Sequence, residues 1–208
     1  MSNSQQHGKS FEDLVKINYS GSSDYGRLNT SPFDIESKFD KKLGLSTSIK
    51  TTKGNDIGLS DARRFFSNDE PHRIIVGKYT QNKNKKEINE VYEIIINADA
   101  LEKLKGDVDF NTVNEFHEKI KTFEKGHHQE ARVYAKNQKQ LIQSTSDSLI
   151  KLNPKIDSKT QRRLQCSVAL NKLIEVVGDE NVTVHTENFG NIGLPINIIS
   201  PKRNLNDK

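Results

Sequence analysis

Two runs of residues, His72–Tyr79 and Glu90–Asn97, constrain the fold of this chain more than any other feature. Each run has β-branched side chains at its centre, which is typical of strands inside a sheet. The segment 82–86 between them contains only Asn and Lys and has the composition of a turn. We therefore expect two successive strands here, and with them a β-sheet at the centre of the fold.

Helical patterns surround these strands. Apolar residues at helical spacing, beginning with Phe11, Leu14 and Val15, predict a first helix over residues 8–19. The other expected elements are short strands at 33–36 and 45–52, a helix over Asp61–Ser67 with Ser60 as its N-cap, helices at 99–105, 111–124, 127–150 and 158–177, late strands at 182–185 and 194–199, and a frayed tail at 201–208. This order predicts a mixed α/β or α+β fold, with a central mixed β-sheet flanked by helices.

The chain has no internal repeat and no low-complexity linker. At 208 residues it is long enough for one substantial core. We therefore expect a single domain over 1–208, with a core at about 8–100 and a largely helical part at about 101–200.

Composition excludes several classes of protein. The single Cys166 excludes an intramolecular disulfide framework and fits a reducing compartment. The segment Met1–Ser10 has no apolar stretch, so we expect no signal peptide, and no run is long enough to cross a membrane. We therefore expect a soluble, cytoplasmic protein. Its formal net charge of +4 is only a weak indication of an anionic partner.

The segment around Lys50 carries the residues of a metal-dependent hydrolytic site. In the expected strand 45–52 alternate side chains share a face, so Ser48 and Lys50 point the same way. Asp34 lies on the preceding strand candidate. A carboxylate and a lysine on neighbouring strands can share a divalent cation such as Mg²⁺ and a water nucleophile, and the Ile49 carbonyl can act as a backbone ligand.

Ser31–Ile35, Ser48–Lys50 and a preceding helix that carries Glu12 make this chain resemble the PD-(D/E)XK nuclease superfamily, in particular type II restriction endonucleases. The resemblance implies a restriction-endonuclease-like core in which Asp34 and Lys50 are catalytic and Mg²⁺ is the cofactor. Two departures stand out. Phe33 interrupts the Pro-Asp pair, and Ser48 stands where the family usually has a second acid.

A subgroup of these enzymes also has Ser-x-Lys and supplies the second acid from the helix after the strand. The matching residue here is Asp61, at the start of the helix Asp61–Ser67, where the helix dipole also favours an acid. Glu12 on the first helix is the other candidate, because many members of the superfamily use a glutamate there as a metal ligand. Asp56 is a third candidate, and the Ser48 hydroxyl would be a much weaker ligand. Each acid has an ordinary structural alternative, as a helix-terminal or surface charge.

The segment Lys151–Gln165 concentrates positive charge, with five basic residues against the single acid Asp157. Its candidate DNA-contacting residues are Lys155, Ser158, Lys159, Gln161, Arg162, Arg163 and Gln165. Arg and Gln are side chains that read guanine and adenine edges, and Ser158 would cap the helix 158–177 that presents them. Contact with the phosphate backbone, readout of bases and an ordinary solvated helix face are all consistent with this composition.

The resemblance implies a Mg²⁺-dependent, sequence-specific endodeoxyribonuclease that cuts double-stranded DNA as a homodimer. The helices over 111–150 are the expected dimer surface. Two alternatives stay open: another nuclease of the superfamily, of the homing, transposon or repair kind, and a catalytically inactive DNA-binding module in which Ser48 records the loss of activity.

Overall fold

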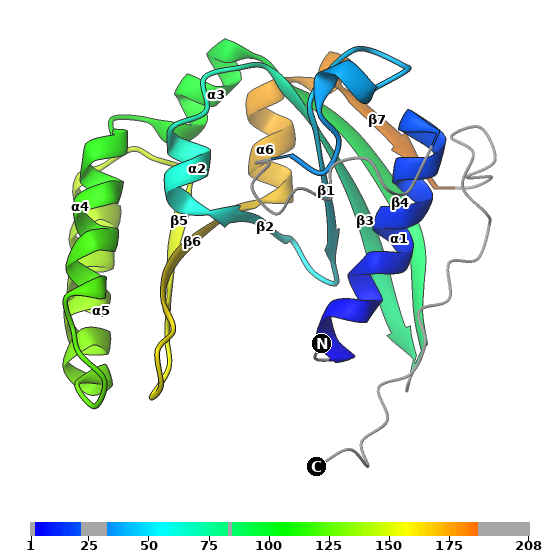
Figure 1. The fold of residues 1–208 in the computed structure, drawn as a ribbon. Coiled ribbons are helices and arrows are strands. Elements are labelled where there is room, and N and C mark those ends of the chain that lie inside the picture. Colours follow the sequence, from blue (N-terminus) through cyan, green and yellow to red (C-terminus); the bar gives the residue numbers. More distant parts are fainter. Residues whose placement is uncertain (1–2, 22–32, 83–84, 187–208) are drawn as a thin grey trace. The chain divides into compact units, whose positions relative to one another are not determined.

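The computed structural model describes residues 3–21, 33–82 and 85–186 (Figure 1). Its helices and strands are α1 (Asn3–Ser20), β1 (Thr47–Thr52), β2 (Asp56–Asp61), α2 (Ala62–Phe66), β3 (His72–Asn82), β4 (Lys85–Ile96), α3 (Ala98–Lys105), α4 (Phe110–Lys121), α5 (His128–Thr145), β5 (Lys151–Ile156), β6 (Arg162–Ala169), α6 (Leu170–Val177) and β7 (Val182–His185), with short 3-10 helices at Ser37–Phe39 and Asp179–Asn181. The predicted mixed α/β class, with a mixed sheet flanked by helices, is confirmed.

The backbone packs as two compact units. The first unit comprises Met1–Asn55, Pro71–Ile96 and Val177–Lys208, and the second comprises Asp56–Glu70 and Asn97–Val176. Each unit has its own sheet, and the second of these sheets was not expected from the sequence. The prediction of a single domain over the whole chain stays a prediction.

The first sheet has the strand order β1-β3-β4-β7. β1 runs parallel to β3, whereas the β3–β4 and β4–β7 pairs are antiparallel, so the sheet is mixed. Ile74, Ile75 and Val76 are buried at consecutive positions of β3, so this strand is covered on both faces. Such continuous burial explains the unbroken apolar run in the sequence.

Helix α1 lies across one face of the first sheet (Figure 1). Its apolar stripe belongs to a buried cluster made of Phe11, Val15, Tyr19, Ile35, Ile49, Ile75, Ile88 and Val91. A Cβ atom at Gly77 would lie 2.9 Å from Phe11 Cζ, so the close approach of the Phe11 ring to β3 requires glycine at this position. Packing of α1 therefore buries the face of β1 that carries Ile49.

The first unit also buries a complete ion pair. Arg73 Nη2 lies 2.8 Å from Asp40 Oδ1, and both side chains are almost fully buried. Arg73 Nε donates to Thr47 Oγ1 at 3.1 Å, and the guanidinium lies over the Tyr19 ring at 4.4 Å. Because these contacts join β3 to the first residue of β1, they hold that end of β1 in place.

Asp40 in turn orders the loop that leads into β1. Its Oδ2 accepts hydrogen bonds from the backbone N–H groups of Leu43 at 3.0 Å and Leu45 at 3.1 Å. Burial alone would raise the pKa of the Asp40 carboxyl, but hydrogen bonds from Arg73, Leu45 and Leu43 outweigh it and hold the pKa below its usual range.

The second sheet has the order β2-β6-β5 and is antiparallel throughout. In β6 the buried positions alternate strictly, with Leu164, Cys166 and Val168 inside and the residues between them facing outward. Helices α4 and α5 lie beside the β5–β6 hairpin (Figure 1). They bury apolar side chains of their own: Val113, Phe116, Ile120, Ala131, Ala135 and Ile142.

The prediction of a helix over 158–177 is wrong for its first part. Residues 162–169 form strand β6, and only Leu170–Val177 are helical. Leu164 and Val168, four residues apart, share a face in a helix and also in a strand, and hydrogen bonding of β6 to strands on both sides decides for the strand. Pro154 lies inside β5, which tolerates proline because it is an edge strand.

Two elements near the predicted active site also differ from expectation. The strand expected at 33–36 is reduced to one bridge between Ile35 and Thr47, after which the chain enters the 3-10 helix Ser37–Phe39. β2 was not predicted, and it contains Ser60 with a positive φ of 75°. Asp61, and not Ser60, is therefore the N-cap of α2.

The two strands predicted at 72–79 and 90–97 are present but longer, because β3 ends at Asn82 and β4 begins at Lys85, inside the expected turn 82–86. Most other elements follow the predictions closely. The helix expected at 8–19, the strands at 45–52 and 182–185, and the helices at 99–105 and 111–124 are confirmed to within a few residues. The helix expected at 127–150 ends at Thr145. The strand expected at 194–199 and the tail at 201–208 lie outside the described residues.

Candidate active site

Asp34 and Lys50 are brought together at the edge of β1 that faces away from β3. The Asp34 N–H donates to the Thr47 carbonyl at 2.9 Å, and the Thr47 N–H donates to the Ile35 carbonyl at 2.7 Å. The Asp34 carboxylate then reaches along β1, where its Oδ2 accepts from the Ile49 N–H at 2.6 Å and lies 3.4 Å from Lys50 Nζ. The sequence predicted this pairing of acid and lysine.

Both side chains are accessible to a ligand. The Asp34 side chain is 27% exposed and that of Lys50 is 19% exposed, so the pair is partly desolvated but open. In the described part of the chain, no hydrogen bond engages Asp34 Oδ1. This oxygen is therefore available to a cation, while Oδ2 is held by the backbone.

The Ile49 carbonyl faces the same edge as the Asp34 carboxylate. The N–H and C=O groups of one strand residue point to the same side of the strand. Because the Ile49 N–H bonds to Asp34, the Ile49 carbonyl is also directed toward that side. One carboxylate oxygen and one backbone oxygen fit the preference of Mg²⁺ for hard oxygen ligands, but they supply a single negative charge.

Glu12 is placed less favourably for a shared metal site. Its Oε1 lies 2.6 Å from Lys16 Nζ one turn further along α1. Helix α1 packs on the sheet face that carries Ile49, whereas Ser48 and Lys50 project from the opposite face. Across the described ranges, no group of three His, Cys, Asp or Glu residues is arranged to hold a metal ion.

Asp61 and Asp56 belong to the second unit. Asp61 Oδ1 accepts from the Arg64 N–H at 3.1 Å and lies 3.9 Å from Arg63 Nε. Asp56 Oδ1 lies 2.9 Å from Lys151 Nζ, in an exposed pair. The role of either acid as a second metal ligand stays a prediction.

The predicted DNA-contacting residues lie on the β5–β6 hairpin and its turn. Lys155 is directly opposite Arg163 in the register, and Asn153 is opposite Gln165, so these four side chains share one face of the hairpin. Ser158, Lys159 and Gln161 belong to the turn between the strands and not to a helix. Sequence reasoning missed Asn153 because its place opposite Gln165 depends on the strand register.

Arg162 points to the other face of the hairpin and is a structural residue. It is 8% exposed. Its Nη1 donates to the carbonyls of Asp157 and Gln161, both at 2.9 Å, and its Nη2 donates to the Glu124 carbonyl at 3.3 Å. The prediction that Arg162 reads bases is therefore not compatible with its position, because strand alternation turns it inward while Arg163 is exposed.

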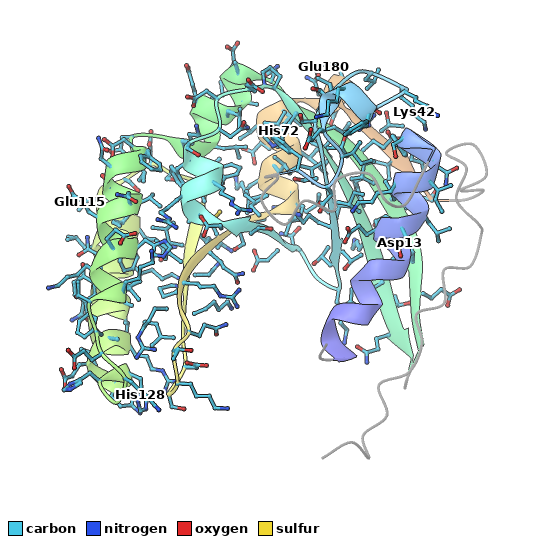
Figure 2. All side chains as sticks on the ribbon, in the orientation of Figure 1. Asp13, Lys42, His72, Glu115, His128 and Glu180 are labelled. Carbon is cyan, nitrogen blue, oxygen red and sulfur yellow. The ribbon has the colours of Figure 1, made fainter. Side chains whose placement is uncertain are left out.

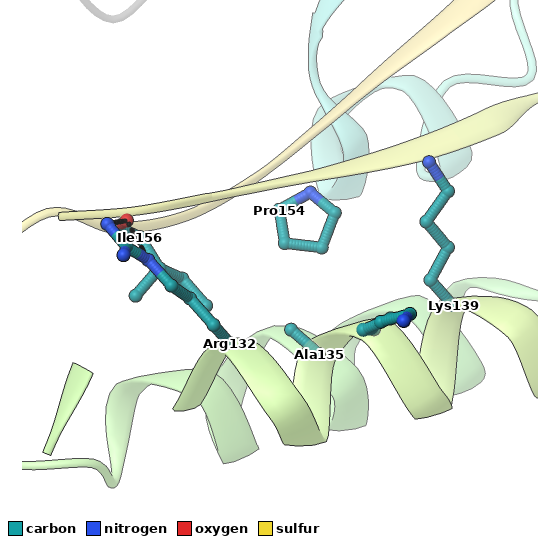
Figure 3. A pocket seen from close by; sticks show the side chains of 6 residues that line it. Arg132, Ala135, Lys139, Pro154 and Ile156 are labelled. Atoms are coloured by element: carbon teal, nitrogen blue, oxygen red, sulfur yellow. Dashed lines mark hydrogen bonds between the residues drawn. The ribbon is translucent and has the colours of Figure 1, made fainter. Parts of the chain in front are cut away.

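A basic pocket of about 280 Å³ lies between α5 and β5 (Figure 3). Its lining combines three cations of α5 with three apolar residues: Arg132, Lys136, Lys139, Ala135, Pro154 and Ile156. Arg132 Nη2 donates to the Ile156 carbonyl at 3.0 Å, which satisfies an outward-facing group of the edge strand β5. The spacing of the three cations along α5 was the signal in the sequence that could have indicated this pocket.

Comparison with models of known protein families, with curated proteins and with solved structures finds no match for this chain. Among the helices in the described ranges, none combines the length and the apolar character that a membrane crossing requires.

Proposed function

We propose that this protein is a Mg²⁺-dependent endodeoxyribonuclease that hydrolyses phosphodiester bonds at specific sequences in double-stranded DNA, in the manner of type II restriction enzymes. The observation that supports it is the Asp34 carboxylate, held by the Ile49 N–H at 2.6 Å and placed 3.4 Å from Lys50 Nζ at an open strand edge. An acid and a lysine in this arrangement can serve metal-assisted hydrolysis.

Each residue of the pair has a separate role in this proposal. Asp34 Oδ1 and the Ile49 carbonyl would hold Mg²⁺, which when bound polarises the phosphate and lowers the pKa of a coordinated water. The Ile49 N–H fixes the orientation of the Asp34 carboxylate. The Lys50 ammonium, which carries its charge at the same edge, stabilises negative charge that develops on the scissile phosphate and orients the attacking water.

A second acid completes the site in this proposal. Asp61 is the first choice, because Ser48 at the usual acid position matches the subgroup with a relocated carboxylate. Glu12 is the second choice, although Lys16 already engages it, and Asp56 is the third. The Ser48 hydroxyl is retained as a weak additional ligand.

Plasmid cleavage in Mg²⁺ tests the proposal. We expect Asp34→Ala and Lys50→Ala each to lower the rate by about 10²-fold or more, the scale of a lost catalytic group. Lys53→Ala and Glu36→Gln are the matched controls, because each removes a charge of the same sign a few residues away. Equal cleavage by all four variants would exclude the Asp34–Lys50 edge as the active site. Ragged, sequence-independent degradation would favour a homing, transposon or repair nuclease instead.

Symmetric cutting of both strands implies a homodimer. The outer side of α5 exposes two apolar side chains, Val133 at 61% and Leu141 at 54%. They lie within the predicted dimer surface 111–150, and burial of such residues favours association. We expect sedimentation to give the mass of a dimer for the wild type and of a monomer for the Val133→Asp/Leu141→Asp double variant.

A catalytically inactive DNA-binding module is the second candidate. It is favoured by the free cationic face of the β5–β6 hairpin, which lies in the other unit from Asp34 and Lys50. Sequence-selective DNA binding without any cleavage in Mg²⁺ would support this candidate over the nuclease.

A further inference from the structure

We propose that the polar face of the β5–β6 hairpin lies in the major groove of duplex DNA, and that Arg163 and Gln165 read base edges there. The inference rests on the duplex-DNA substrate of the proposed function. It does not require the Asp34–Lys50 pair to be active, so binding and cleavage can test the two proposals separately.

The two faces of the hairpin differ sharply in chemistry. Leu152, Leu164 and Cys166 project from one face and are almost completely buried. The opposite face carries Lys155 beside Arg163 and Asn153 beside Gln165. Figure 2 shows side chains standing on the side of the hairpin that faces away from α4 and α5. One face therefore anchors the hairpin in its unit and the other is available to a ligand.

The side chains on the polar face are free to bind. Lys155 and Arg163 are exposed and Gln165 is half-buried. No residue in the described ranges forms a hydrogen bond or an ion pair with any of these three side chains. Asn153 is held by the Ser167 hydroxyl at 2.8 Å, which fixes its amide in place.

The charge of the hairpin end is positive and is not cancelled locally. The Asp157 carboxylate in the turn accepts from the N–H groups of Lys159 at 2.9 Å and Gln161 at 2.8 Å, and these bonds, the Gln161 bond first, lower its pKa. These bonds shape the turn, and the single negative charge of Asp157 is outnumbered by the charges of Lys155, Lys159, Arg162 and Arg163. Asp61 lies opposite Gln165 on the β2 side and caps α2. Lys155, without such a partner, can attract a phosphate that flanks a groove.

The shape of the hairpin fits a groove. β2 pairs with β6 from Gln165 to Ala169, so the hairpin from Arg162 to Leu164 is a two-stranded ribbon and Gln165 lies at its base, where β2 ends (Figure 1). The major groove of B-DNA admits a two-stranded β-ribbon. Arg162 also ties the turn to the Glu124 carbonyl that follows α4, which favours an ordered ribbon before DNA binds. A ribbon that is ordered before binding loses little conformational entropy when it binds.

The residue types predict what is read. Arg makes bidentate hydrogen bonds to guanine, and Gln makes them to adenine. Arg163 and Gln165 are two residues apart on one strand, a separation of roughly 7 Å, which is about two base-pair steps. We therefore expect a guanine and an adenine about two steps apart in the preferred sequence.

Selection from a pool of randomised duplexes, with Ca²⁺ in place of Mg²⁺ to prevent cutting, tests this inference. Arg163→Lys is the decisive variant because it keeps the charge but loses the bidentate geometry. We expect Arg163→Lys and Gln165→Ala each to lose roughly 5- to 150-fold of discrimination at one position of the preferred sequence. Lys155→Ala should weaken binding to all sequences equally and lower the salt dependence by about one phosphate contact.

Lys103→Ala, which removes an exposed charge on α3 of the same unit, is the matched control, and circular dichroism confirms that each variant is folded. If the wild type selects a defined sequence and Arg163→Lys and Gln165→Ala select it equally well, the hairpin does not read bases and the nuclease proposal stands. If the wild type binds duplex DNA without preference, or not at all, both proposals are wrong.

Discussion

The two sheets of this protein bury their strands in different ways. In the first sheet, Ile74, Ile75 and Val76 of β3 are buried in succession, so side chains cover both faces. In the second sheet, β6 alternates between buried residues and residues that face outward. The first sheet is therefore a scaffold whose candidate site lies at a strand edge. The second sheet exposes one whole face of its hairpin to a possible ligand. The two β-sheets thus carry two kinds of candidate site, one at a strand edge and one on a sheet face.

The two arginines at strand positions show the same contrast. Arg73 is fully buried and paired with Asp40, whereas Arg163 is exposed and has no partner in the described ranges. A buried arginine needs its acid, because an unpaired charge inside a protein is strongly unfavourable. An exposed, unpaired arginine has no such structural requirement, and its guanidinium is available to a ligand.

The largest effect is expected for Asp40→Ala, which leaves the Arg73 guanidinium buried without a counter-charge. We expect a loss of about 3–5 kcal/mol in the free energy of unfolding, measured by urea denaturation. Glu36→Ala is the control. It removes the Glu36–Lys38 pair, in which the lysine side chain is 66% exposed, and should change stability by less than about 1 kcal/mol. Similar losses in both variants would show that Arg73 is not buried as described.

Leu164→Ala should be nearly as damaging, because it opens a cavity under the second sheet. We expect a loss of about 2–5 kcal/mol in the free energy of unfolding. Gln165→Ala, one residue further along, should change stability by less than about 0.5 kcal/mol because its side chain is on the polar face. Cys166→Ser should again destabilise the protein, since it adds a hydroxyl to a buried site. Destabilisation at 164 without an effect at 166 would instead indicate a helix.

A smaller effect concerns acid stability. The pKa of Asp40 is held below its unfolded value, so the carboxylate contributes stability that is complete above the unfolded pKa of about 4. That contribution is lost as the pH falls through the native pKa. The difference in stability between the wild type and Asp40→Asn should therefore shrink as the pH is lowered from 5 toward 2. A difference that is constant over this range would contradict the assigned pKa shift.

The smallest effect on stability separates two roles of Asp61. Asp61→Ala removes the N-cap of α2 and should lower the free energy of unfolding by about 1 kcal/mol. Asp61→Asn keeps an equally good cap but removes the negative charge, so stability should be nearly unchanged. If Asp61 supplies the second acid of the nuclease, Asp61→Asn loses Mg²⁺-dependent cleavage while it stays folded. Near-normal cleavage would exclude Asp61 and favour Glu12.

Several features were accessible from the sequence because they depend on local patterns. The helix around Phe11 and Val15 and the strand that contains Lys50 follow a period, and β3 is marked by its run of β-branched residues. The meeting of Asp34 with Lys50 was predicted from spacing together with a family resemblance. Ile35 bonds to Thr47 through the backbone, and this contact places the acid beside the lysine without a full strand at 33–36.

The β5–β6 hairpin is a region whose structure could not be predicted from local sequence patterns. In the segment 158–177, the spacing of Leu164 and Val168 fits a helix and a strand equally well, and pairing with β2 and β5 selects the strand. That selection turns Arg162 inward and Arg163 outward. Neighbouring strand residues point to opposite faces. The sequence therefore cannot tell which of the two arginines reaches a ligand until the segment is known to be a strand.

The sequence by itself determined the mixed α/β class, because periodicity is a property of consecutive residues, and with a family resemblance it predicted the pairing of Asp34 with Lys50. Only the tertiary structure decided that the chain has a second sheet, that Arg73 is buried with Asp40, and that Arg163 shares a free face with Gln165. These features depend on contacts between residues far apart in the chain. The free energy of such contacts depends on which surfaces are buried against each other in the folded protein.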